Sequence, residues 1–229
     1  MPTNTQSDIR TQGYVLRRTN YGEADRILNI ITPEHGKISA IAKGVRREKS
    51  KLAGGVEMFS LVDLNIHFGK KDMGTVTSAK MLKYYSNLLT DLTRMELAAL
   101  ILKKISNAAE HTDSPEFFKI VDATLPALNS GASLELVEAW FWFNLAKAQG
   151  EEVNLYRDAT GEKLTEDGLY RWDSYESALV ATSNGDIDAD AIKVMRLMLT
   201  ADLKVAMRIK GVENILPRIL PIARAVNKL

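Results

Sequence analysis

The sequence predicts an α+β protein in which a small β-barrel precedes a mainly helical region. Two observations support this fold class. The first 85 residues contain short apolar and β-branched runs separated by glycine-bearing turns, with clear two-residue alternation at residues 59–68, whereas from about residue 90 apolar side chains recur at three- and four-residue spacing. We therefore expect a β domain over residues 1–85 and a helical domain over residues 86–229.

Five short strands are expected in the first domain, with a polar turn at residues 19–23 after the first of them. They are predicted at residues 13–18, 26–32, 37–45, 59–68 and 75–82. The fourth is the clearest, because Val62, Leu64 and Ile66 alternate with polar residues. A flat sheet would leave two exposed edges, so a closed or nearly closed barrel is expected. An OB-type barrel fits the number of strands, although that number alone does not separate it from an SH3-like barrel.

The second domain is expected to contain several helices and one irregular insert. Helical periodicity begins near residue 92. Ser114 and Ser133 are typical N-caps of further helices, and Gly150 is a typical end for the second of these. Residues 154–180 break the periodicity and contain two turn dipeptides, so a short hairpin or irregular insert is expected there.

Three further features of the helical domain carry expectations. Asp188 is expected to cap a helix that runs to about Arg208. Pro217 and Pro221 are expected to restrict the final helical stretch to short pieces. Four consecutive aromatic residues at 140–143 indicate either a buried central helix or the wall of a pocket for a partner peptide.

The composition is that of an ordinary globular protein, with 45% hydrophobic and 26% charged residues. The chain has no cysteine, which excludes disulfides, thiolate metal sites and cysteine nucleophiles. No apolar run approaches the roughly 18 residues that span a membrane, and the N-terminus lacks the apolar core of a signal peptide. We expect a cytoplasmic protein without membrane contact.

No residue pattern supports an enzyme. There is no Walker-type phosphate loop and no Gly-x-Ser-x-Gly elbow. The three histidines, at positions 35, 67 and 111, have no partner at metal-ligand spacing, and we expect His35 and His67 to be ordinary surface side chains. The expectation is therefore a binding protein without catalytic residues, metal or cofactor.

Charge is unevenly distributed along the chain. Residues 1–85 hold 14 Lys and Arg against 8 Asp and Glu, whereas residues 86–229 hold 16 against 21. A polyanionic partner would therefore meet the first domain, unless the difference is only the imbalance that small domains often carry.

A basic stretch at residues 43–51 is the most informative feature. Lysines and arginines near phosphates release condensed counterions, and this gives an affinity for nucleic acid that does not depend on the nucleotide sequence. Glycines 44, 54 and 55 are expected to leave this loop free to follow a nucleic-acid backbone. Tyr21 and Tyr14 are candidates for stacking on unpaired bases, with ordinary packing as the alternative. The predicted DNA contacts are Arg17, Arg18, Arg26, Lys37, Lys43, Arg46, Arg47, Lys49, Lys51 and Tyr21.

An ordered series of segments in the first domain resembles the RecO family of DNA repair proteins. The segments are YVLRR at 14–18, YGEADR at 21–26, TPEHGK at 32–37, AKGVRR at 42–47, KSKLAG at 49–54 and FSLV at 59–62. Any one of them is a weak signal, whereas their order is specific. The remaining chain resembles the family mainly in its layout.

The resemblance implies an N-terminal OB fold, binding to single- and double-stranded DNA, and annealing of complementary strands without a cofactor. It also implies a mediator role with RecR, in which the RecA recombinase replaces single-stranded-DNA-binding protein. Many family members carry a four-cysteine zinc site in the insert. This chain has no cysteine, so turns and packing must hold residues 154–180 in place of a metal.

The resemblance suggests a mechanism and a partner site. The basic side chains neutralise phosphates on two strands, so that complementary bases can meet, and the protein reads backbone rather than sequence. The acidic, apolar C-terminal tail of single-stranded-DNA-binding protein is expected on the helical part. The cations proposed for it are Lys103, Lys104, Lys119 and Lys147.

Two alternative functions remain open from the sequence. OB barrels also serve in RNA-binding proteins, so the fold does not decide between the nucleic acids. The chain is alternatively a helical scaffold whose barrel docks a protein, with DNA binding incidental.

Overall fold

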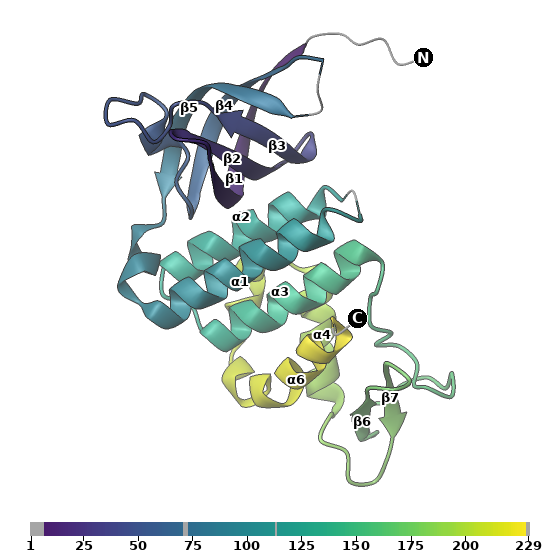
Figure 1. Ribbon diagram of the computed structural model, residues 1–229. Helices are drawn as coiled ribbons and strands as arrows, with labels where there is room; N and C mark the ends of the chain where they lie inside the picture. The colour runs from purple at the N-terminus through teal and green to yellow at the C-terminus, as the bar shows by residue number, and fades with distance from the viewer. Residues whose placement is uncertain (1–6, 71–72, 113, 228–229) are drawn as a thin grey trace. The chain divides into compact units, whose positions relative to one another are not determined.

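The computed structural model describes residues 7–70, 73–112 and 114–227 (Figure 1). The chain divides into two compact units, Met1–Leu125 and Pro126–Leu229. The hydrophobic spacing changes near residue 85, where the strands of the barrel end. The boundary between the two units comes later, between Leu125 and Pro126, inside the helix Glu116–Asn129. The first unit therefore contains the barrel together with the helices that follow it directly.

Five strands close into a barrel in the order β1-β2-β3-β5-β4. They are β1 (Ser7–Tyr21), β2 (Asp25–Thr32), β3 (Gly36–Ala42), β4 (Ser60–Phe68) and β5 (Gly74–Tyr84). Neighbours run antiparallel except β3 and β5, which run parallel. Strand β1 closes the barrel, because it pairs with β4 through its first half and with β2 through its second.

The predicted end of the first strand is wrong. Residues 19–21 were expected to turn, but Asn20 and Tyr21 continue the ladder by pairing with Arg26 and Asp25. The turn is confined to residues 22–24, where Gly22 has a φ of +53°. A glycine adopts this left-handed conformation without steric cost, which allows polar residues on both sides to remain in the strands.

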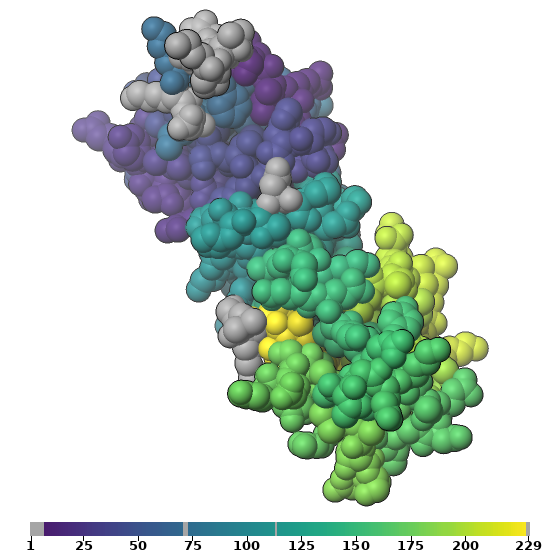
Figure 2. All heavy atoms as spheres, turned by 90° about the vertical axis from the view of Figure 1, so that its right-hand side faces the viewer, coloured from purple at the N-terminus to yellow at the C-terminus, as the bar shows by residue number. Residues whose placement is uncertain are grey.

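The barrel core is formed by inward-facing aliphatic side chains. Leu28, Ile30 and Ile66 are fully buried there, and the strands form one packed body in the space-filling view (Figure 2). Val45 and Val56 join the same core, although both belong to the long connection between β3 and β4. That connection is therefore anchored in the barrel at two points.

Six α-helices and a small hairpin follow the barrel. The helices are α1 (Leu92–Ala108), α2 (Glu116–Asn129), α3 (Leu134–Gln149), α4 (Ala189–Thr200), α5 (Leu203–Ala206) and α6 (Leu216–Val226). The hairpin consists of β6 (Tyr170–Asp173) and β7 (Ala178–Ala181), and short 3₁₀ turns occur at Ala53–Gly55, Ser86–Thr90 and Val212–Asn214. The expected helix starts are confirmed, because Ser114 and Ser133 accept backbone N–H groups of the first turns of α2 and α3. Gly150 ends α3 with a φ of +85°.

Two expectations for the C-terminal helices are wrong. The helix capped by Asp188 ends at Thr200 rather than near Arg208, because Ala201 adopts an extended conformation and a separate short helix follows. The final stretch is one helix, α6, and not several pieces. Pro217 stands in its first turn, where no intrahelical partner for an N–H is lost, and Pro221 lies on its exposed side.

The aromatic residues of α3 form a buried central helix, as the first of the two expectations stated. Trp140, Phe141, Trp142 and Phe143 are between 0% and 7% exposed. The indole N–H groups of both tryptophans are satisfied, one by the carbonyl of Ala201 and the other by a carboxylate. The middle of this helix is therefore buried on all sides.

Within the first unit, Tyr14 joins the barrel to α2. Its hydroxyl donates to the carboxylate of Asp122 at 2.7 Å and lies 3.1 Å from the hydroxyl of Tyr85. Its ring packs against those of Tyr85 and Phe118. Burial, with these hydrogen bonds, raises the pKa of Tyr14 well above its usual value. Tyr14 is therefore a packing residue and is not available to stack on a base.

The insert is held by polar side chains that bond to the backbone. Asn154, Asp158 and Asp173 each accept two or more backbone N–H groups from the residues that follow them. Arg196 of α4 donates twice to the carbonyl of Leu155. These bonds close the turns locally, as expected of an insert without cysteine.

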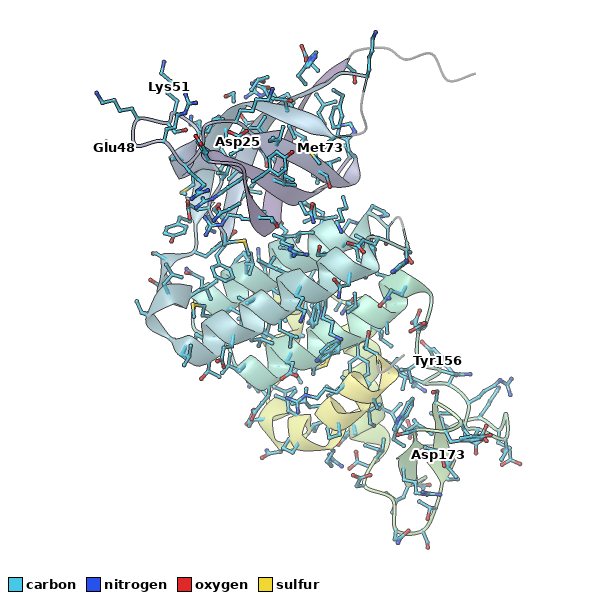
Figure 3. All side chains as sticks on the ribbon, viewed as in Figure 1. Asp25, Glu48, Lys51, Met73, Tyr156 and Asp173 are labelled. Carbon is cyan, nitrogen blue, oxygen red and sulfur yellow. The ribbon has the colours of Figure 1, made fainter. Side chains whose placement is uncertain are left out.

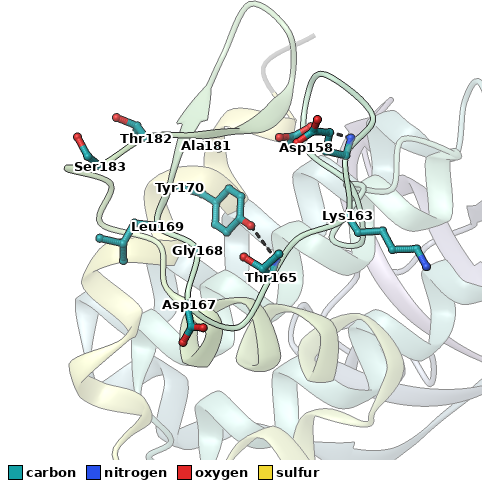
Figure 4. A pocket seen from close by; sticks show the side chains of 11 residues that line it. Asp158, Lys163, Thr165, Asp167, Gly168, Leu169, Tyr170, Ala181, Thr182 and Ser183 are labelled. Atoms are coloured by element: carbon teal, nitrogen blue, oxygen red, sulfur yellow. Dashed lines mark hydrogen bonds between the residues drawn. The ribbon is translucent and has the colours of Figure 1, made fainter.

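A pocket of about 500 Å³ lies in the insert (Figure 4). Its wall is formed by the turn around Asp158 and by the start of the hairpin, where the Tyr170 hydroxyl accepts the backbone N–H of Thr165 at 2.8 Å. Asp167 and Thr182 lie at its rim (Figure 4).

No helix in the described part of the chain is long and apolar enough to cross a lipid bilayer.

Replacing Tyr14 by Phe should lower the free energy of unfolding by about 1–3 kcal/mol, because the buried Tyr85 hydroxyl loses its partner and the exposed Asp122 carboxylate loses a donor. Urea denaturation followed by circular dichroism measures this loss. Tyr21→Phe is the matched control, because that side chain is 56% exposed, and it should change stability by less than about 0.5 kcal/mol. Equal stability of the two variants would contradict the anchoring role of Tyr14.

A second prediction concerns Asp188, which caps α4 by accepting the Ala191 N–H and also accepts a bond from Arg218 at 2.7 Å. The hydrogen bond from Arg218 lowers the pKa of Asp188. Its ionised form therefore contributes stability above the unfolded pKa of about 4, and that stability is lost as the pH falls through the lower folded value.

Asp188→Asn keeps the cap and removes the charge. The variant should therefore be less stable than the wild type at pH 7, and the difference should shrink as the pH falls below about 4. Thermal unfolding of the wild type and the variant between pH 7 and pH 3 measures the difference in stability and its dependence on pH. A difference independent of pH would show that the charge of Asp188 contributes nothing.

Candidate nucleic-acid interface

The basic stretch at residues 43–51, hereafter the basic loop, is fixed at its base to the β1–β2 turn. The N–H of Gly44 donates to the Asp25 carboxylate at 2.7 Å, and the N–H of Arg46 donates to the Ala24 carbonyl at 2.9 Å. The Arg46 guanidinium reaches the carbonyl of Gly22. The loop and the turn beside Tyr21 therefore form one assembly.

The expectation of a loop left free by its glycines is wrong at both ends of the connection. Gly44 is held by the bond to Asp25. A Cβ atom on Gly55 would lie 2.5 Å from the carbonyl oxygen of Ala79, so β5 lies against the backbone there. Only the tip projects, with Glu48 and Lys51 pointing away from the barrel (Figure 3).

Six of the predicted DNA-binding cations are exposed and form no salt bridge with the described residues. They are Arg17, Lys43, Arg46, Arg47, Lys49 and Lys51. Five of them come from the basic loop. Because none of these five forms a salt bridge with the described residues, they make the loop end of the barrel electropositive.

A β-bulge determines where the two neighbouring arginines of β1 point. The register shifts between Val15 and Arg17, so that Arg17 lies opposite Asn29 and Arg18 lies opposite Leu28. Leu28 belongs to the barrel core, and directly opposed residues share a face. The bulge therefore sends Arg17 outward and Arg18 to the inner face at the barrel end.

Arg18 and Arg26 differ from the exposed cations because both approach Glu57. The Arg18 guanidinium lies 2.5 Å from one Glu57 oxygen, and that of Arg26 lies 3.9 Å from the other. The three side chains are 27%, 25% and 37% exposed. Arg26 also donates to the side-chain oxygen of Asn20 at 3.2 Å.

Lys37 is occupied by α1. Its ammonium donates to the carbonyl of Ser106 and to the carboxylate of Glu110, both at 2.8 Å, and its side chain is only 10% exposed. The hydrogen bond from Lys37 lowers the pKa of Glu110. Lys37 thus joins β3 to the C-terminal end of α1, where a cation also interacts favourably with the helix dipole.

The outward face of β1–β3 adds residues that sequence reasoning missed. Arg17 lies opposite Asn29, and Asn29 opposite Ser39, while Ile27 lies opposite Ile41 in the next row. All except the exposed Arg17 are half-buried, and the Ser39 hydroxyl donates to the side-chain oxygen of Asn29 at 3.0 Å. Their signal was the alternation in residues 26–32, which assigns Ile27 and Asn29 to the face opposite Leu28.

The four lysines proposed for a protein tail come from both units. Lys103, Lys104 and Lys119 belong to the first unit and Lys147 to the second. Lys119 pairs with Glu116 at 2.6 Å, and Lys147 donates to the carbonyl of Leu199 at the end of α4. Lys103 is exposed.

The described residues contain no group of three or more His, Cys, Asp or Glu side chains that could hold a metal ion. The insert does not fit the four-cysteine zinc site, because the chain has no cysteine. His67 and Asp8 form an exposed pair at 2.6 Å, and His35 is exposed in the turn before β3.

Two family models match this chain. The model described as "Recombination protein O N terminal" matches residues 6–85, and the model described as "Recombination protein O C terminal" matches residues 89–226. Together they span the barrel and the helical region.

Proteins named DNA repair protein RecO are similar over most of the chain. The protein of Alkaliphilus metalliredigens is 32% identical over 209 residues, which are 90% of this chain and 83% of its own length. That of Dehalococcoides mccartyi is 30% identical over 212 residues, 89% and 83% of the two chains. That of Bifidobacterium longum is 38% identical over 122 residues, 52% and 51% of the two chains.

Lys37 and Lys43 are expected to respond differently to substitution. Lys37→Met should lower the free energy of unfolding by about 1–2 kcal/mol, because the carbonyl of Ser106 loses a charged donor. Lys43→Met, the matched control at the exposed end of β3, should leave stability unchanged within about 0.5 kcal/mol. Thermal unfolding of the two variants is the measurement, and equal losses would contradict the anchoring of α1 by Lys37.

Proposed function

This chain belongs to the RecO family of DNA repair proteins, and we propose that it acts as a non-catalytic recombination mediator. In this proposal it binds single- and double-stranded DNA and anneals complementary strands. With RecR it then helps to load RecA onto DNA covered by single-stranded-DNA-binding protein. We assign the five-stranded barrel to the OB type and place the DNA on it.

The observation that carries the proposal is the set of exposed, unneutralised cations on an anchored loop at one end of the barrel. Arg46 and Arg47 lie at the base of the loop, where the N–H groups of Gly44 and Arg46 bond to the β1–β2 turn. Cations held in this way neutralise phosphates without regard to sequence. Two strands brought to one positive surface repel each other less, which favours annealing.

The outward face of β1–β3 provides a complementary surface for bases. Ile27 and Ile41 offer a half-buried apolar area, and Asn29 and Ser39 offer polar groups beside it. Tyr21, at the edge of this face, is exposed enough to stack on a base. Such contacts hold a strand while its base edges stay open to pairing.

A surface on the second unit supports the proposed contact with the acidic, apolar tail of single-stranded-DNA-binding protein. Val205 and Met207 are 45% and 40% exposed on and directly after α5. The exposed cations Lys204, Arg208 and Lys210 stand on either side of this pair in the sequence. Exposed apolar side chains with cations nearby in the chain match the chemistry of that tail, and the lysines at 103, 104, 119 and 147 remain alternative cations for it.

Strand annealing tests the proposal. The wild type, mixed with two complementary labelled oligonucleotides over a salt series and without nucleotide cofactor, should anneal them. Changing Arg46, Arg47, Lys49 and Lys51 to Ala should abolish annealing at moderate salt. It should also flatten the log–log salt dependence of single-strand binding by about three units, because four phosphate contacts are lost.

A matched control removes four exposed cations from the second unit instead, as Arg157, Lys163, Arg171 and Lys193 to Ala. It should bind and anneal DNA like the wild type. A loss of annealing in the control equal to that in the loop variant would remove the barrel from the proposal. Tighter binding to matched RNA than to DNA would favour an RNA-binding protein, and no DNA binding at low salt would favour a protein-docking scaffold.

A further inference from the structure

Glu57 is the carboxylate on which Arg18 and Arg26 converge at the end of the barrel. Its two oxygens face the two guanidinium groups, at 2.5 Å and 3.9 Å. The shorter of these contacts is a hydrogen bond that Arg18 donates, and Arg26 donates a further hydrogen bond to the side-chain oxygen of Asn20. The carboxylate therefore occupies a site that two cations from neighbouring strands create.

The positions of these groups are fixed by the barrel. Arg18 lies opposite Leu28 in the ladder and Arg26 lies opposite Asn20, so both arginines share the inner face with the core at its open end. Glu57 follows the buried Val56, and its carbonyl accepts the Ser60 hydroxyl at 2.6 Å. The backbone beneath all three charged side chains is thus held by the core.

The site has the chemistry of a phosphate site. Arginines present planar forks of donors that fit the oxygens of carboxylates and phosphates alike. A phosphodiester would place its two free oxygens where the carboxylate oxygens now lie. Because all three side chains are partly exposed, their ion pairs are screened by water and contribute little to stability. Replacing the Glu57 carboxylate by a phosphate therefore costs little free energy.

We propose that the open end of the barrel is a DNA phosphate subsite, which the Glu57 side chain occupies in the free protein and leaves when a DNA phosphate binds Arg18 and Arg26. The subsite rests on the proposed function, because it extends the surface of the basic loop. Glu57 acts as an internal competitor that lowers affinity for DNA. Binding there requires a strand already held by the loop, since a lone phosphate must displace a tethered carboxylate.

Glu57→Gln tests the subsite, because the amide keeps the shape and loses the charge. The affinity of this variant for a single-stranded oligonucleotide at moderate salt should rise at least threefold. The slope of log affinity against log salt concentration should steepen by about 0.7, which is the contribution of one additional phosphate contact. Glu48→Gln is the matched control. It removes the same charge from the tip of the basic loop, where Glu48 forms no salt bridge with the described residues, and it should raise affinity less.

Substitution of Arg18 and Arg26 shows whether the gain in DNA affinity arises at these two side chains. In a background of Arg18→Gln and Arg26→Gln, Glu57→Gln should give no more gain than Glu48→Gln. That double arginine variant alone should bind DNA more weakly than the wild type, a result that does not depend on the folding of Glu57→Gln. Circular dichroism confirms folding of each variant.

Three results would overturn the subsite while leaving the proposed function intact. These are equal gains from Glu57→Gln and Glu48→Gln, a Glu57→Gln gain that persists without the two arginines, or unchanged DNA affinity of the double arginine variant. A wild-type chain that binds no DNA would refute the proposed function itself, and with it the subsite.

Discussion

Closure of the barrel is the constraint on which the rest of the structure depends. Because β1 must pair with β4 along one half and β2 along the other, it is the longest strand and carries a bulge where its partner changes. Closure leaves no strand edge to protect, because every strand has two neighbours. Val45 and Val56 join the barrel core from the β3–β4 connection, and this fixes the position of the basic loop.

The sorting of the cations follows from this geometry. The bulge directs Arg17 to the outer face and Arg18 to the inner one, where Glu57 meets it. Lys37, at the other end of β3, is close enough to α1 to bond with it. Cations of similar sequence context are therefore exposed, ion-paired or bonded to a helix, according to the nearest carboxylate or carbonyl.

The sequence predicted those parts of the fold that depend on local pattern. Alternation located the five strands, and cap residues such as Ser133 and Gly150 located helix ends, because each is set by residues adjacent in the chain. The register slip at Leu16, the burial of Tyr14 and the occupation of Lys37 depend on partners far along the chain. The site could therefore be predicted as a set of cations, but not as an arrangement of them.

Anchoring also bears on how the proposed surface would bind. A flexible loop loses conformational entropy when it orders around a ligand, and that loss is subtracted from the affinity. Here Gly44, Val45 and Val56 are ordered by bonds and burial before any DNA arrives, so only the side chains at the tip lose freedom. On the proposed function, the loop would hold a strand through few contacts, which would leave the bases free to meet a complementary strand. An internal carboxylate at the barrel end limits the net charge of this surface, and a surface that binds less tightly also releases its annealed product more readily.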